Sequence, residues 1–128
     1  MSLLLDTCVF LWLTLTPEKL SQKATTVISD PTNKVFLSTV SAWEIAIKYG
    51  KGQLLLDDPP RIFVPKKCTE QNIEILPLDL PSALRTNDLP SIHYDPFDRI
   101  LICQALTSDF TLVTSDSAIQ KYAVKTIW

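Results

Sequence analysis

Glycine is scarce in this chain, with two residues in 128, and both lie close together at positions 50 and 52. A dinucleotide-binding loop and a phosphate-binding P-loop each need several glycines at fixed spacing, because the backbone must approach the phosphates closely. Neither pattern is present, which argues against a nucleotide cofactor. We expect the two glycines to end a helix that begins near Ala42, since glycine suits the left-handed turn after a helix.

Cysteine and histidine are rare as well. The three cysteines, Cys8, Cys68 and Cys103, are widely spaced and form no C-x-x-C pair, so neither a disulfide framework nor a zinc site is indicated, and a reducing, cytoplasmic location is expected. The one histidine, His93, would have to serve any serine or cysteine hydrolase, yet no nucleophile motif accompanies it. The sequence therefore argues against nucleophilic hydrolases.

Long apolar runs are also missing. Residues 3–5 are interrupted at once by Asp6, and residues 9–15 are too few for a membrane span or a secretory signal. The net charge of −2 gives no broad attraction for nucleic acid, although bound cations would cancel carboxylate charge locally. With 46% hydrophobic residues, 128 residues are enough for one core, so we expect a single domain over residues 1–128 without membrane association.

Short apolar segments alternate with helical patterns along the chain. Strands are expected over residues 2–5, 35–38, 73–76, 111–114 and 124–127. Helices are expected over residues 9–13, 17–29, 42–50, 60–72, 81–85, 96–107 and 117–122. Strands separated by helices require crossover connections, so the pattern predicts an α/β fold with a parallel or mixed sheet.

Four acidic residues stand where a strand pattern gives way to a helix start, namely Asp6, Glu44, Asp98 and Asp116. The carboxyl ends of parallel strands gather along one rim of a sheet, so acids far apart in sequence can meet there. Crowded carboxylates repel one another unless a cation compensates, and hard oxygen ligands favour Mg²⁺ or Mn²⁺. The pattern therefore predicts a divalent metal site suited to metal-assisted hydrolysis of phosphodiesters.

Three of these acids have a purely structural alternative. Asp6 and Asp116 suit the N-cap position of a helix. Ser41 and Glu44 match the capping box, in which the third helical residue reaches back to the amide of the cap. Independent capping does not require one acid at each of four strand exits, whereas a shared cation does.

The segment around Pro96 holds two acids three residues apart. Proline suits the first helical turn, so we assign Asp95 to the cap and Asp98 to the metal, while a swap of these two roles stays open. The helix that follows is apolar nearly all round, as expected for a helix buried beside a sheet. Such a helix would hold Asp98 rigidly.

Several neighbouring side chains are candidates for supporting roles. Thr7 and Ser41 offer hydroxyl groups that could orient a carboxylate or a bound water. His93 and Arg99 are expected to border the site, where Arg99 would offer a forked donor to a substrate phosphate, with a salt bridge on the helix surface as the alternative. Lys48 and Lys51 are similar candidates, with a solvated helix face as the preferred interpretation.

Four segments, in this order, resemble the PIN domain nucleases, and above all the VapC-type toxins of bacterial toxin–antitoxin pairs. They are residues 3–7, 41–46, 93–99 and 113–116, so that the resemblance covers essentially the full chain. Asp6, Glu44, Asp98 and Asp116 match the acidic quartet of that family. Thr114 matches the hydroxyl that often stands two residues before the last acid.

The resemblance implies a Rossmann-like three-layer α/β/α sandwich with a mainly parallel sheet of about five strands. It also implies an endoribonuclease that depends on Mg²⁺ or Mn²⁺, acts on single-stranded RNA or exposed RNA loops, and is inhibited by a small VapB-type antitoxin. We expect a homodimer, and the helices around residues 9–15 and through Trp43 are candidate surfaces for the antitoxin or a second protomer. The alternative is a non-catalytic metal-binding, RNA-binding or protein-interaction module of the same fold.

Overall fold

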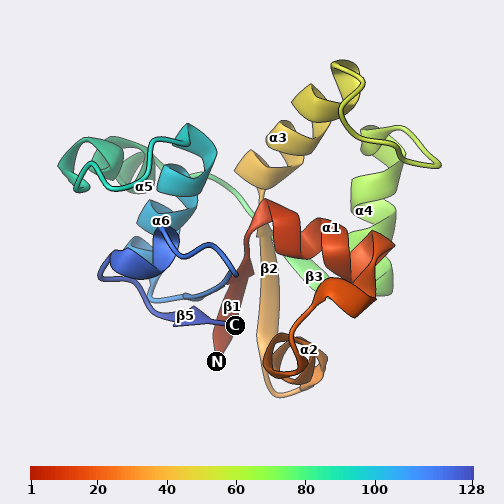
Figure 1. The fold of residues 1–128 in the computed structure, drawn as a ribbon, viewed down its shortest axis with the longest axis horizontal. Helices are drawn as coiled ribbons and strands as arrows, with labels where there is room; N and C mark the ends of the chain where they lie inside the picture. The colour runs from red at the N-terminus through yellow and green to blue at the C-terminus, as the bar shows by residue number, and fades with distance from the viewer.

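A five-stranded parallel sheet organises the protein, whose residues 1–128 are all described by the computed structural model (Figure 1). The strand order is β3-β2-β1-β4-β5, and every neighbouring pair is parallel. The strands are β1 (Ser2–Leu5), β2 (Lys34–Ser38), β3 (Ile73–Leu76), β4 (Thr111–Val113) and β5 (Thr126–Ile127). The predicted α/β fold with a parallel sheet is confirmed, and β1 is the central strand.

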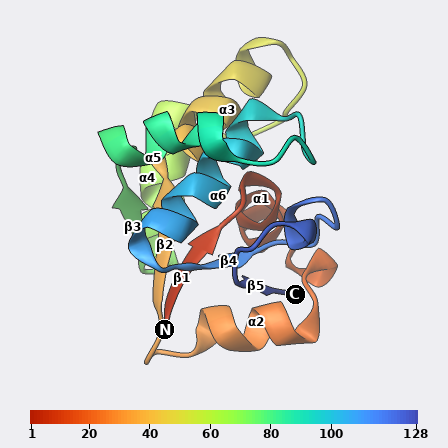
Figure 2. The same cartoon turned by 90° about the vertical axis from the view of Figure 1, so that its left-hand side faces the viewer.

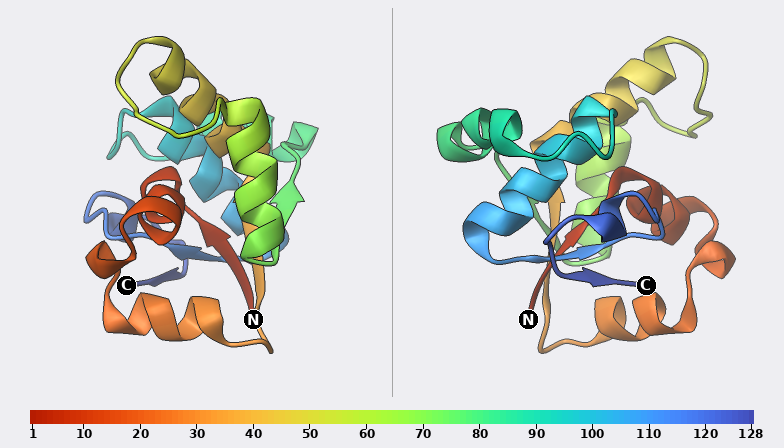
Figure 3. Two further views of the ribbon diagram at one scale, coloured as in Figure 1. Left: turned by 90° about the vertical axis from the view of Figure 1, so that its right-hand side faces the viewer. Right: turned by 60° about the vertical axis from the view of Figure 1, so that its left-hand side comes forward.

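Six α-helices surround the sheet and complete a three-layer α/β/α sandwich. They are α1 (Thr7–Leu15), α2 (Gln22–Ser29), α3 (Thr39–Gly50), α4 (Pro60–Glu70), α5 (Leu80–Arg85) and α6 (Pro96–Ser108), with short 3₁₀ turns η1 (Pro17–Lys19), η2 (Thr86–Asp88) and η3 (Ile119–Lys121). Helices α1, α2 and α4 cover one face, as the left view of Figure 3 shows, whereas α5 and α6 lie on the other face (Figure 2). No helix is long and apolar enough to cross a membrane.

The alternation of side chains in β1 separates two apolar cores. Leu3 and Leu5 pack with α1, α2 and α4, whereas Leu4 packs with α6, and all three side chains are fully buried. A parallel sheet buried on both faces needs such continuous apolar strands, which explains why the run of leucines was a reliable strand signal. Asp6 follows directly and ends the run at the carboxyl rim of the sheet.

The predicted helix over residues 17–29 is wrong, because the segment is divided. Leu20 is extended, with φ −72° and ψ 142°, and the hydroxyl of Ser21 accepts the amide hydrogen of Ala24 to start α2. Leu20 packs against the core of α1 and α2, so the break directs a large apolar side chain inward. A local serine cap therefore overrides the apparent continuity of the helical pattern.

The start of α3 also differs from the prediction. Ser38, the last residue of β2, caps the helix by accepting the Val40 amide at 3.0 Å, so Ser41 already lies in the first turn. The capping-box alternative for Ser41 and Glu44 is therefore wrong. Glu44 lies in the middle of α3 and not in its first turn. At its other end α3 stops at Gly50 as expected, and Gly52 adopts a left-handed φ of 70°.

Two other helices are shorter than expected. The helix expected over residues 60–72 ends at Glu70. Asn72 takes a left-handed φ of 55°, and the chain turns there into β3. The helix expected over residues 117–122 is reduced to the 3₁₀ turn η3. Both differences lie at element ends, where local hydrogen bonds compete with helix propagation.

Candidate metal centre

One cleft at the carboxyl rim of the sheet gathers all four of the predicted acids. Its volume is about 370 Å³, and its lining comprises Asp6, Thr7, Cys8, Leu11, Glu44, Lys48, Asp95, Asp98, Ser115 and Asp116. A larger hollow of about 680 Å³ lies beside α5 and α6, but Asp88 is the single carboxylate in its lining. The chemistry of a cation site is therefore concentrated in the smaller cleft.

Asp6 serves the helix and the cleft at once. Its Oδ1 accepts the Val9 amide hydrogen at 2.7 Å and caps α1, while the side chain is almost fully buried. Burial raises the pKa of Asp6 above its usual value, although the Thr114 side chain and the Val9 amide oppose this shift. The capping role and the site role are thus compatible, because one carboxylate has room for both.

Glu44 carries the clearest sign of a missing partner. The residue is 6% exposed, and its Oε2 forms an ion pair with Lys48 Nζ at 2.9 Å. The other oxygen, Oε1, is buried and has no hydrogen-bond partner. A buried carboxylate oxygen without a donor is costly, so a cation in the cleft would satisfy an atom that the protein itself leaves unsatisfied.

Asp95 and Asp98 divide their roles at the start of α6. Asp95 caps the helix as expected, since its Oδ1 accepts the amide hydrogens of Phe97 at 2.9 Å and Asp98 at 3.4 Å. Burial, together with the charges of Asp95 and Asp6, raises the pKa of Asp98 to about 7. A carboxylate that holds its proton near neutrality is what crowding of acids without a compensating cation produces.

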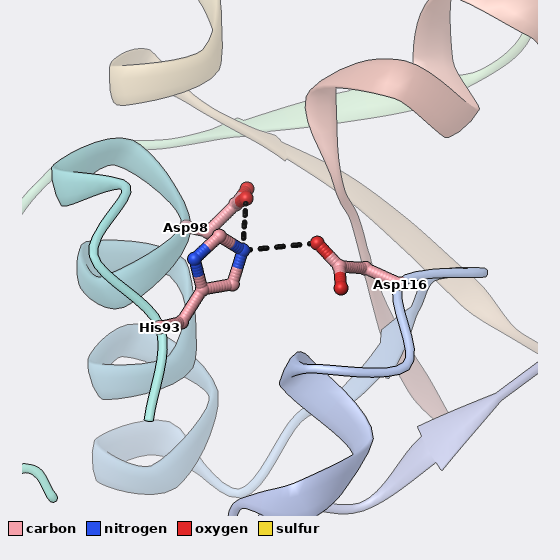
Figure 4. A group of neighbouring side chains, drawn as sticks. All are labelled: His93, Asp98 and Asp116. Carbon is pink, nitrogen blue, oxygen red and sulfur yellow. Dashed lines mark hydrogen bonds and ion pairs between the residues drawn. The ribbon is translucent and has the colours of Figure 1, made fainter. Parts of the chain in front are cut away.

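His93 lies between two of the acids (Figure 4). Its Nε2 is 3.0 Å from Asp98 Oδ2 and 2.9 Å from Asp116 Oδ2, and one donor atom from each of the three residues lies within 4.8 Å of the others. The ring comes from the loop before α6, Asp98 from the first turn of α6, and Asp116 from the loop after β4. His93 therefore contacts two of the four acids, although it is not among the residues that line the cleft.

Asp116 is the most open of the four acids. Burial raises the pKa of Asp116, but the Ala118 amide at 2.8 Å from Oδ1 and the nearby His93 outweigh burial and leave the pKa below its usual value. Thr114 Oγ1 accepts the Asp116 amide hydrogen at 3.0 Å and fixes the turn that carries the carboxylate. Asp116 is thus held in its ionised form.

The other predicted residues have structural partners. The Thr7 hydroxyl donates to Ser41 Oγ at 2.9 Å, and this buried contact joins α1 to α3 beneath the cleft. Arg99 donates to the carbonyl oxygens of Thr86 and Pro90 at 2.9 Å and of His93 at 3.2 Å. Its guanidinium therefore fastens the loop before α6, and a contact with a substrate phosphate would require these bonds to break.

The pairing of Lys48 with Glu44 and the contacts of Tyr122 were not predicted from the sequence. Lys48 lines the cleft and forms an ion pair with Glu44, so it is more than a residue of a solvated helix face. The spacing of four residues between Glu44 and Lys48 is typical of such ion pairs on a helix and could have predicted this one. The hydroxyl of Tyr122 accepts the amide hydrogens of Ile92 and His93 at 3.2 and 2.8 Å. No local pattern links Tyr122 to a loop 29 residues earlier.

The donor set fits a hard divalent cation. The cleft presents carboxylate oxygens from separate elements, it contains an unpartnered buried oxygen on Glu44, and Lys48 supplies a single positive charge against five acids in its lining. Such oxygen-rich sites suit Mg²⁺ or Mn²⁺, whereas the nearby thiol of Cys8 is held protonated because burial raises its pKa. The residues present are therefore suited to the ion that the sequence pattern predicted.

Comparison with known proteins yields one family and several similar folds. The family model described as the PIN domain matches residues 3–125. VapBC2 from Rickettsia felis, solved with a DNA fragment from its promoter, has a TM-score of 0.73 and 12% identity over 99% of this chain and 98% of that chain. A comparison with curated protein sequences gave no match.

Two further solved structures have the same architecture. VapBC-1 from nontypeable Haemophilus influenzae has a TM-score of 0.66 and 15% identity, covering 99% of this chain and 97% of that chain. VapBC-5 from Mycobacterium tuberculosis, a member of the VapBC family of toxin–antitoxin systems, has a TM-score of 0.60 and 16% identity, covering 98% and 95%. At these identities the likeness establishes a shared fold.

Proposed function

Because this chain belongs to the PIN domain family, we propose that it is an endoribonuclease that cuts RNA with the aid of Mg²⁺ or Mn²⁺. The observation that carries the proposal is the convergence of four acids from separate elements on one cleft, together with the unpartnered Oε1 of Glu44. Carboxylates alone do not hydrolyse a phosphodiester at neutral pH, whereas carboxylates that hold a metal ion do.

The residues of the cleft divide the work. Asp6, Glu44, Asp98 and Asp116 would hold the ion, which supplies Lewis-acid polarisation of the phosphate and a water of lowered pKa. Lys48 pairs with Oε2 of Glu44 and leaves the unpartnered Oε1 as the oxygen that would hold a cation. The chain itself therefore contributes a fixed set of oxygens and a local positive charge beside them.

This mechanism gives the RNA 2′-hydroxyl no role. Attack by water predicts products with 5′-phosphate and 3′-hydroxyl ends. A 2′,3′-cyclic phosphate on the upstream fragment would overturn the hydrolytic mechanism, because it arises only from attack by the 2′-hydroxyl. Mass spectrometry of the products of a short defined RNA distinguishes these outcomes.

The decisive test is cleavage by matched variants. Purified protein is incubated with single-stranded and structured RNAs, with Mg²⁺, Mn²⁺ or chelator, beside the variants Asp6→Asn, Asp98→Asn and Glu44→Gln. The amides keep the shape of the side chains but lose the charge, so we expect cleavage to fall at least about 100-fold, the loss typical of removing one electrostatic contact to the reacting charge. Glu74→Gln on β3, outside the cleft lining, is the control.

The failure of this proposal has a clear form. If the wild-type protein binds metal and remains folded but cuts none of the RNAs, the chain is a metal-binding or RNA-binding module of the same fold. If the control variant loses activity to the same extent as Glu44→Gln, the acidic cleft is not the site of the reaction.

We also infer that the protein is a toxin restrained by a VapB-type antitoxin and forms a homodimer. Support for the toxin and its antitoxin comes from the similarity to the VapBC structures, one of them named as part of a toxin–antitoxin system. Induced expression in a bacterium should arrest growth, and Glu44→Gln should abolish the arrest. Growth without arrest, from a protein that cuts RNA in vitro, would separate the nuclease from the toxin role. Light scattering of the purified protein tests the dimer.

A further inference from the structure

His93 is held at both nitrogens of its ring. Its Nε2 lies 2.9 Å from Asp116 Oδ2 and 3.0 Å from Asp98 Oδ2, and its Nδ1 lies 3.2 Å from the backbone nitrogen of Asp95 (Figure 4). The ring is 17% exposed, so its partners are chiefly protein groups. These three contacts determine which nitrogen carries the proton.

The Asp95 contact has only one possible direction. A backbone amide donates and never accepts, so Nδ1 must present its lone pair to the Asp95 amide hydrogen. Because Nδ1 accepts a hydrogen bond, the ring carries its proton on Nε2. The Nε2–H group consequently donates toward the carboxylates of Asp98 and Asp116.

A metal ion would need the opposite arrangement. Coordination by Nε2 requires its lone pair, which would move the ring proton to Nδ1 and set it against the Asp95 amide hydrogen. We propose that His93 is not a ligand of the ion, although it lies among candidate ligands, and is instead a positioning residue that holds Asp98 and Asp116 through Nε2–H. This inference rests on the proposed cation site.

The contacts leave the carboxylates free to bind an ion. Both bonds to Nε2 involve Oδ2, so Oδ1 of Asp98 is not used by the ring, and Oε1 of Glu44 is a buried oxygen without a partner. Without the imidazole, Asp98 and Asp116 would be neighbouring acids from separate elements with no donor between them. The donor between them reduces their repulsion and fixes their separation.

The loop that carries His93 is fastened to the same helix as Asp98. Arg99, one residue after Asp98, donates to the carbonyl oxygens of Pro90 and His93, and the Tyr122 hydroxyl accepts the His93 amide hydrogen at 2.8 Å. Tyr122 also donates to the Pro90 carbonyl at 2.9 Å. The imidazole and the carboxylate that it orients are therefore parts of one clamped unit, as a positioning role requires.

The first test reads the tautomer directly. Because His93 is the one histidine in the chain, its two ring nitrogens can be assigned in a long-range ¹H–¹⁵N NMR spectrum without mutagenesis. In the metal-free protein we expect Nε2 to be protonated and Nδ1 to be unprotonated, and we expect the same tautomer after saturation with Mg²⁺. A protonated Nδ1, or a switch of tautomer when Mg²⁺ is added, would overturn the proposal.

The second test measures Mn²⁺ binding by electron paramagnetic resonance. His93→Leu removes the donor, so we expect Mn²⁺ affinity to fall about 10- to 100-fold, the usual effect of losing a group that orients a ligand. His93→Gln keeps an N–H donor and should stay within a few-fold of wild type. Tyr94→Leu is the matched control, since Tyr94 is 83% exposed and adjacent in sequence.

Spin-echo spectra of bound Mn²⁺ separate positioning from coordination. A ligand role predicts strong coupling to a directly bound ¹⁴N nucleus that disappears in the glutamine variant, and this result would overturn the proposal. Equal affinity of His93→Leu and wild type, with both folded by thermal unfolding, would also overturn it. None of these measurements needs RNA cleavage, so a protein that binds Mn²⁺ as expected but cuts no RNA would refute only the nuclease.

Discussion

Neutralising Asp98 should make the metal-free protein more stable while destroying its ion site. The pKa of this carboxyl is raised from 3.8 to about 7, first by burial and then by the charges of Asp95 and Asp6. At pH 8 the folded protein must therefore ionise a group that prefers to keep its proton. A difference of about three pKa units corresponds to about 4 kcal/mol. Asp98 borders an open cleft, where solvent and salt screen its charge. We therefore expect Asp98→Asn to raise the free energy of unfolding by about 2 kcal/mol at pH 8.

The sign of the pH dependence follows from the raised pKa. Below about pH 4 the carboxyl is protonated in both the folded and the unfolded chain, so its ionisation costs the folded protein nothing. As the pH rises toward the folded-state pKa of about 7, the unfolded chain ionises first, and folding loses stability. The advantage of Asp98→Asn should thus be small at pH 4 and full at pH 8.

Urea denaturation with chelator at the two pH values measures this difference. Asp88→Asn is the control, because Asp88 is exposed and outside the cleft, and we expect its free energy of unfolding to match wild type. Saturating Mg²⁺ should stabilise wild type, by about 2.7 kcal/mol at 100 times the Kd, and should leave Asp98→Asn unchanged. If Asp98→Asn is no more stable than wild type at pH 8, the ionised Asp98 carboxylate does not destabilise the metal-free protein and the reasoning is refuted.

Three other substitutions test the parts that support the site. Tyr122→Phe leaves two loop amides without their acceptor, so we expect a loss of about 1–3 kcal/mol and faster hydrogen exchange at Ile92 and His93; unchanged exchange would contradict the clamp. Ser38→Ala removes the cap of α3, so we expect urea denaturation to show a loss of about 1 kcal/mol in the free energy of unfolding; no loss would contradict this cap. Lys48→Met leaves the buried Glu44 unpaired and should lower the thermal midpoint in chelator, with recovery in Mg²⁺; no recovery would argue against a cation at Glu44.

Local features of the sequence predicted the framework and the contents of the cleft. The apolar run before Asp6 predicted the central strand, because a strand buried on both faces has no polar alternation. The acids at expected strand ends predicted a shared rim, since all parallel strands end there. Only Asp6 and Asp116 follow strands, however, whereas Glu44 and Asp98 reach the cleft from helices α3 and α6. The pairing of Asp95 with Pro96 predicted the start of α6, because capping is a contact between near neighbours in the chain.

The contacts that hold the acids in place depend on tertiary packing. Ser38 took the cap of α3 because β2 runs directly into the helix, and this freed Glu44 to face the cleft. His93 forms hydrogen bonds with Asp116 and Tyr122, which lie 23 and 29 residues later in the sequence. Arg99 donates to a carbonyl oxygen of the loop that carries His93. Such contacts depend on where whole elements pack, so periodicity and spacing do not encode them. Local sequence thus encodes which chemical groups reach the rim, whereas packing establishes which of their oxygens stay without a protein partner there.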